Sequence, residues 1–169
     1  LSASSNDDKI AWYENNGSES FTEHVISTSG DNAISVYAVD VDGDGDMDVL
    51  SASSNDDKIA WYENDGSEGF TTHVISTSAN GARSVYAVDV DGDGDMDVLS
   101  ASNVDDKIAW YENDGSESFT EHVISTSADN AISVYAADLD ADGDMDVLSA
   151  SNADDKIAWY ENDGSESFT

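Results

Sequence analysis

The fold is decided by residues 35–53, SVYAVDVDGDGDMDVLSAS, in which a run of aspartates separates two short apolar segments. The segments are rich in β-branched and aromatic residues, which favours β-strands. Between them, residues 40–48 place a carboxylate at every second position. Gly45 stands at the sixth position of this loop, where a side chain would obstruct a sharp turn. The stretch therefore predicts a strand, an ion-binding loop and a second strand in succession.

The same stretch recurs along the chain at a spacing of 49 residues, as the series Leu1, Leu50, Leu99 and Leu148 shows. A fixed period near 50 residues is typical of propellers, solenoids and other repeat arrays. In such arrays each unit buries its apolar faces against its neighbours rather than alone. We therefore expect one continuous array rather than several independent domains.

Each repeat is expected to contain four short strands, which in the first complete copy fall at residues 35–39, 49–53, 58–63 and 70–76. The sequence Asn64-Asp65-Gly66 favours a hairpin between the last two, because these residue types tolerate positive φ. The strands carry apolar side chains on both faces, which fits sheets stacked between neighbouring sheets. Four strands in about 50 residues is the usual size of a propeller blade.

The predicted fold class is all-β, a β-propeller-type array of four-stranded antiparallel blades that forms an incomplete ring. Within the single array, residues 1–169, we expect partial blades at 1–29 and 133–169 and complete blades at 35–78 and 84–127. We interpret the chain as a piece of a longer protein, or as one that closes a ring by associating with other copies.

The aspartate loop has the pattern D-x-D-x-D-G-D-x-D and is expected to bind Ca²⁺, a hard cation that prefers six to eight oxygen ligands. Two carboxylates 4 Å apart repel by roughly 4 kcal/mol at an effective dielectric constant of 20. Because the loop contains five carboxylates, we expect a cation to offset their repulsion. The seventh residue of the loop is expected to bind through its backbone carbonyl. A solvated acidic turn and a Mg²⁺ site remain alternatives. We expect about one ion per loop, three in the chain, held by Asp40, Asp42, Asp44, Asp46 and Asp48; by Asp89, Asp91, Asp93, Asp95 and Asp97; and by Asp138, Asp140, Asp142, Asp144 and Asp146.

The negative charge of the chain limits the kinds of partner that it can bind. The formal net charge is −33, from 38 acidic and 5 basic residues. Such a chain repels nucleic acid and anionic membrane surfaces. No apolar run approaches the length of a membrane helix. We expect cations, glycans or extracellular proteins as partners, no membrane insertion, and a secreted or cell-surface location.

Two further rows of residues repeat with the same spacing. The first row consists of tryptophans, Trp12, Trp61, Trp110 and Trp159. Their rings could stack on sugars, but we favour a role in packing between blades. The second row consists of histidines, a residue type that often binds transition metals, at positions 24, 73 and 122. Because there is only one in each blade, they should not meet at a single ion, and we expect surface or edge histidines.

A strand, the aspartate loop and a second strand, repeated about every 50 residues, resembles the FG-GAP/VCBS repeat, the blade of integrin α-type propellers and of many bacterial secreted proteins. The resemblance spans the whole chain. It implies a calcium-stabilised propeller with one ion between the first two strands of each blade, held by the aspartates given above.

We expect a non-catalytic, extracellular calcium-binding module for adhesion or recognition. Every carboxylate cluster recurs in each copy, whereas an enzyme needs one asymmetric set of acids and bases. The alternatives are a glycan-binding lectin-like propeller, a structural or self-assembling repeat protein, and the accessory propeller of a secreted polysaccharide-degrading enzyme.

Overall fold

The computed structural model describes residues 1–165 and 167–169, which form strands and no helix. The strands are β1 (Ser2–Ser4), β2 (Lys9–Asn15), β3 (Phe21–Ser27), β4 (Ala33–Val39), β5 (Asp48–Ser53), β6 (Lys58–Asn64), β7 (Phe70–Ser76), β8 (Ala82–Val88), β9 (Asp97–Ser102), β10 (Lys107–Asn113), β11 (Phe119–Ser125), β12 (Ala131–Ala137), β13 (Asp146–Ser151) and β14 (Lys156–Tyr160). In the described part of the chain we find no long apolar helix of the kind that spans a bilayer.

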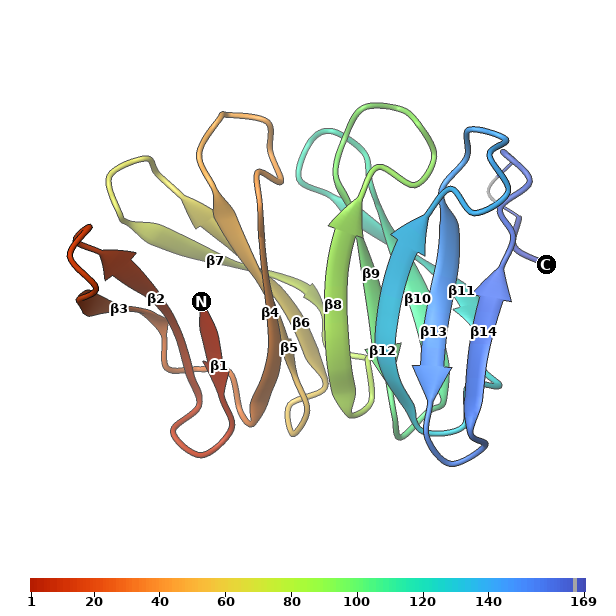
Figure 1. Cartoon of the computed structure of the whole chain (residues 1–169), viewed down its shortest axis with the longest axis horizontal. Coiled ribbons are helices and arrows are strands. Elements are labelled where there is room, and N and C mark those ends of the chain that lie inside the picture. Colours follow the sequence, from red (N-terminus) through yellow and green to blue (C-terminus); the bar gives the residue numbers. More distant parts are fainter. Residues whose placement is uncertain (166) are drawn as a thin grey trace.

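The strands form four antiparallel sheets that stand side by side (Figure 1). Their strand orders are β1-β2-β3, β4-β5-β6-β7, β8-β9-β10-β11 and β12-β13-β14, so two complete four-stranded sheets lie between two three-stranded ones. The sheets do not close into a ring. The predicted all-β, propeller-type array with its 49-residue repeat is confirmed.

The strand boundaries differ from the prediction by one or two residues. Strand β4 begins at Ala33 rather than at Ser35, because a bulge at Ile34 lets Ala33 pair with Ser53. Strand β5 begins at Asp48, the last residue of the aspartate loop, which pairs with Val39. The loop and the sheet are therefore continuous at that residue.

Neighbouring sheets pack through one repeated contact, in which the Ile/Trp face of one sheet covers the Ala/Tyr face of the next. Ile59 and Trp61 of β6 share a core cluster with Ala109 and Tyr111 of β10, and all four are buried. Equivalent residues form the cores of the other two junctions. Burying a large apolar side chain contributes on the order of 2 kcal/mol, so these stacked faces are the main source of stability.

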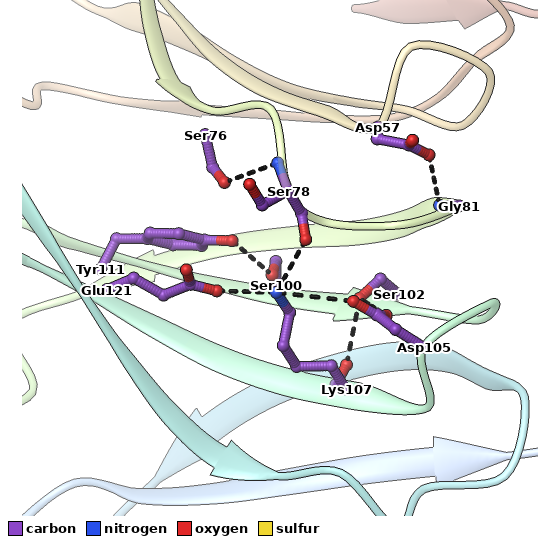
Figure 2. A network of polar contacts seen from close by, with 10 residues as sticks. All are labelled: Asp57, Ser76, Ser78, Gly81, Ser100, Ser102, Asp105, Lys107, Tyr111 and Glu121. Atoms are coloured by element: carbon purple, nitrogen blue, oxygen red, sulfur yellow. Dashed lines mark hydrogen bonds and ion pairs between the residues drawn. The ribbon is translucent and has the colours of Figure 1, made fainter.

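The linker between consecutive sheets is held by a polar network (Figure 2). Lys107 Nζ donates to the Ser78 carbonyl oxygen at 2.8 Å and lies 2.7 Å from Glu121 Oε1. The backbone N–H of Gly81 donates to Asp57 Oδ1 at 2.8 Å. The linker is thus fixed by a lysine of the sheet that follows it and an aspartate of the sheet that precedes it.

Candidate metal centre

The three aspartate loops lie at one end of the stacked sheets, each joining the first two strands of its repeat (Figure 1). Gly45 has a φ of 99°, as the predicted sharp turn requires. In the third loop Ala141 takes the place of Gly43 and adopts a φ of 65°, so the loop keeps its left-handed turn without glycine. The loops of neighbouring sheets are adjacent, since Asp91 and Asp144 line one shared hollow.

Three carboxylates of each loop converge on one point. The first, third and ninth aspartates bring one oxygen each within 4.8 Å of the others, an arrangement that can hold a metal ion. The groups are Asp40, Asp42 and Asp48; Asp89, Asp91 and Asp97; and Asp138, Asp140 and Asp146. Three of the five carboxylates expected in each loop therefore form a repeated group that could hold a metal ion.

The ninth aspartate is the buried member of each group. Asp48, Asp97 and Asp146 are fully shielded from solvent. Asp97 Oδ2 accepts a hydrogen bond from the backbone N–H of Val90 at 2.9 Å, and its Oδ1 accepts one from Asn113 at 2.8 Å. Each oxygen keeps a second lone pair, so these bonds leave the carboxylate free to bind a cation.

Burial penalises the charged form of these carboxyl groups. It raises the pKa of Asp97 to about 6, although the bonds from Asn113 and Val90 act to lower it. It also raises the pKa of Asp48, and it raises the pKa of Asp42 and Asp91 with a further contribution from neighbouring carboxylates. A divalent cation would offset this cost, because an opposite charge at short range favours the ionised carboxylate.

The fifth and seventh aspartates do not join the converging groups. Asp44 Oδ1 accepts a hydrogen bond from the Asp46 backbone N–H at 2.8 Å. The Asp46 carboxylate lies against Gly66 in the next hairpin, where a Cβ on Gly66 would collide with it. Asp95 and Asp144 lie in the same way against Gly115 and Gly164. The seventh side chain therefore points to the hairpin, an arrangement compatible with the backbone-carbonyl role predicted for that residue.

An asparagine missed by the sequence reasoning fastens the hairpin to the loop. Asn64 donates from its backbone N–H to Asp48 Oδ1 at 2.7 Å and from Nδ2 to the Met47 carbonyl at 3.1 Å. Asn113 and Asn162 make the equivalent bonds. The available signal was an asparagine that follows the ninth aspartate by 16 residues in every loop-containing repeat.

The tryptophan and histidine rows lie together. Trp61 and Trp110 are fully buried between sheets, which agrees with the packing role that we favoured for them. Each stacks on the histidine of the neighbouring strand, His73 or His122, with ring centroids 4.5 Å apart. The histidines remain in separate sheets, as expected. His73 lies on β7, the edge strand of its sheet, with one-third of its side chain exposed, and it forms a further cluster of metal-ligand type with Glu63 and Glu117.

The chain is similar to one known family of repeats. A family described as FG-GAP-like repeat matches residues 1–51, 40–100 and 89–149, and so most of the chain. Each of the last two matches begins at the first aspartate of a loop. No curated protein matches the chain significantly.

Proposed function

The chain belongs to the FG-GAP-like repeat family, and on that basis we propose that it is a non-catalytic, extracellular propeller module whose aspartate loops bind calcium and which serves adhesion or recognition. The observation that carries the calcium assignment is the convergence of three carboxylates in each loop, one of them buried and already hydrogen-bonded into the sheet.

The ligand set favours Ca²⁺ over other divalent ions. The converging groups offer only oxygen, and Ca²⁺ accepts six to eight oxygen ligands in flexible geometry. The carboxylate of the fifth residue and the carbonyl of the seventh would bring the protein ligands to five, and bidentate binding or water would supply the remaining oxygens. Mg²⁺ demands a stricter octahedron and retains its waters.

Bound calcium would join three segments of each blade. The first aspartate follows β4, the ninth begins β5, and the ninth is also bonded to the β6–β7 hairpin through Asn64. An ion at this point neutralises part of a strongly negative surface and makes this end of the sheets rigid. Rigid loops at one end of a stack form a suitable platform for a partner, which supports the recognition role.

The repetition of the site supports a non-catalytic role. All three loops have the same residues at the converging positions and the same hydrogen bonds to the ninth aspartate. Enzymes instead place groups with different tasks in one asymmetric constellation.

Thermal unfolding and calorimetry test the proposal together. Calcium added to EDTA-treated protein should bind with a stoichiometry near three and raise the melting temperature, because an ion that binds only the folded state stabilises it by mass action. At 100 times the dissociation constant each site adds about 2.7 kcal/mol. Magnesium serves as the control and should have a smaller effect. An unchanged melting temperature with calcium would contradict the assignment.

A second role, self-association, is favoured by the two end faces of the stack. Ile157 and Trp159 of β14 are 76% and 47% exposed, whereas their counterparts Ile108 and Trp110 are fully buried under the next sheet. At the other end Tyr13, which corresponds to a tyrosine buried in the central sheets, is 40% exposed. An Ile/Trp face and an Ala/Tyr face are the two halves of the contact that joins the sheets within the chain. We propose that these two faces join further sheets of the same kind, and that in the isolated 169-residue chain a second copy supplies them by docking its Tyr13 face on the Ile157 face.

Sedimentation velocity in calcium tests this docking. Wild-type protein should associate with rising concentration, and Ile157→Lys should abolish association by placing a charge in the contact. Val104→Lys is the matched control, because Val104 is equally exposed but lies in a turn away from that face. A wild-type chain that stays monomeric, or equal behaviour of the two variants, would contradict the docking.

A further inference from the structure

A second kind of ligand cluster lies at the junction between the two complete sheets. Glu63 of β6, His73 of β7 and Glu117 of the β10–β11 hairpin bring one ligand atom each within 4.8 Å of one another. His73 Nε2 is 2.7 Å from Glu63 Oε2. Two of the ligands thus come from one sheet and the third from the next, so the cluster exists only where sheets stack.

The imidazole ring of this cluster is held in a fixed orientation. His73 stacks on Trp61 with ring centroids 4.5 Å apart and an interplanar angle of 25°. Trp61 is itself immobilised in the core between the sheets. The ring edge therefore stays directed at the carboxylates, and little conformational freedom is lost when a ligand binds.

The cluster is open to ions. His73 and Glu63 are each about one-third exposed, and Glu117 is exposed. Glu117 and Trp61 also line a hollow of about 360 Å³ between the two sheets. A cation drawn to this acidic surface can reach the ligands without opening the stack.

Equivalent residues of the preceding repeats meet at the junction between the first and second sheets. His24 Nε2 lies 3.3 Å from Glu14, and His24 Nδ1 lies 3.7 Å from Glu68 of the following sheet. His24 stacks on Trp12 with centroids 4.2 Å apart. The array therefore repeats one feature, a histidine that lies between a glutamate of its own sheet and a glutamate of the next sheet. The distance from the histidine to the glutamate of its own sheet is longer at this junction, 3.3 Å against 2.7 Å.

We propose that Glu63, His73 and Glu117 bind a divalent transition-metal ion of the zinc class and that the ion links neighbouring sheets. One imidazole nitrogen with two carboxylates is a ligand set that suits Zn²⁺ and related ions, whereas Ca²⁺ prefers oxygen ligands alone. Three protein ligands leave one position of a tetrahedral shell for water. The site differs from the aspartate loops in residues, in ligand chemistry and in spanning two sheets.

Zinc binding in the presence of saturating calcium tests the site, because calcium occupies the oxygen-only loops. Calorimetry with Zn²⁺ alone as titrant should show uptake by the wild type. His73→Gln and Glu117→Gln, which alter different sheets, should each remove one equivalent or weaken it by roughly tenfold or more. Co²⁺ provides a spectroscopic readout, since its visible absorption bands on the wild type should weaken in both variants. Circular dichroism and melting in calcium verify that each variant is folded.

Glu19→Gln is the matched control. Glu19 occupies the same hairpin position as Glu117 with the same φ of 63°, but it lies in the first sheet, where no described histidine of an earlier sheet faces it. Its substitution should leave zinc uptake unchanged. Absence of zinc uptake by the wild type would overturn the proposal. So would uptake that is undiminished in both variants. Uptake that is reduced by His73→Gln but not by Glu117→Gln would also overturn it, since the ion would then not join two sheets.

Discussion

The backbone N–H of Asn113 and the carboxylate of Asp97 are joined by a hydrogen bond of 2.8 Å across 16 residues of chain. Asp97 begins β9 and Asn113 ends β10, so the bond closes the end of the sheet beside the aspartate loop. The second oxygen of Asp97 accepts from Val90, the second residue of that loop. The buried aspartate therefore has a structural task that does not depend on a metal ion, in addition to the proposed one of binding it.

The structural task and the metal-binding task of Asp97 can be distinguished by comparing Asp97→Asn with Asp91→Asn. Both should remove one calcium equivalent, because each deletes a converging carboxylate. In EDTA only Asp97→Asn should lower the free energy of unfolding, by about 1–3 kcal/mol, since the amide nitrogen would face a backbone donor in a buried site. Urea unfolding with and without calcium measures both effects. Equal stability of the two variants in EDTA would contradict the structural task assigned to Asp97.

The seventh loop position provides a test of the ligand scheme. The Asp95 carboxylate lies against Gly115, outside the converging group, so Asp95→Asn should change calcium affinity far less than Asp91→Asn does. Calorimetry on the two variants gives the comparison. A loss as large as that of Asp91→Asn would mean that the Asp95 side chain, rather than its backbone carbonyl, binds the ion.

The contact between Asp95 and the hairpin predicts a difference between two glycine substitutions. Gly92 and Gly115 both have positive φ, of 79° and 71°, so alanine should cost each about 1 kcal/mol in backbone strain. A Cβ on Gly92 would meet open space, and Ala141 stands at that place in the third loop, whereas a Cβ on Gly115 would collide with Asp95.

Gly115→Ala should therefore destabilise the protein more than Gly92→Ala does, and the excess should shrink in the background Asp95→Ala, which removes the colliding carboxylate. Urea unfolding of the single and double variants gives the coupling. Equal losses for the two glycines would show that the hairpin does not rest on Asp95.

The sequence predicted the repeat, the order of the strands and the place of the converging aspartates, because these follow from local patterns. Alternating carboxylates, the Asn-Asp-Gly hairpin and the apolar strands each act within a few residues of chain. The roles of Asn113, Lys107 and the His73 cluster were not predictable in this way. Each depends on a partner in another strand or in the next sheet, and the register and stacking that bring those partners together are set by the folded array.

The contribution of Lys107 to holding the linker between sheets can be measured by comparison with Lys156, the equivalent lysine in the last sheet. The Lys107 side chain is 10% exposed, and its ammonium group donates to the Ser78 carbonyl at 2.8 Å and contacts Glu121 at 2.7 Å. The Lys156 side chain is 49% exposed and reaches the equivalent Ser127 carbonyl only at 3.4 Å. Lys107→Met keeps the aliphatic stem but leaves the Ser78 carbonyl without its donor, so it should lower the free energy of unfolding by about 1–3 kcal/mol. Lys156→Met should change it by less than about 0.5 kcal/mol, because water replaces the lysine at an exposed position. Urea unfolding in saturating calcium measures both. Similar effects of the two substitutions would show that the linker is held by the backbone and Asp57 contacts alone.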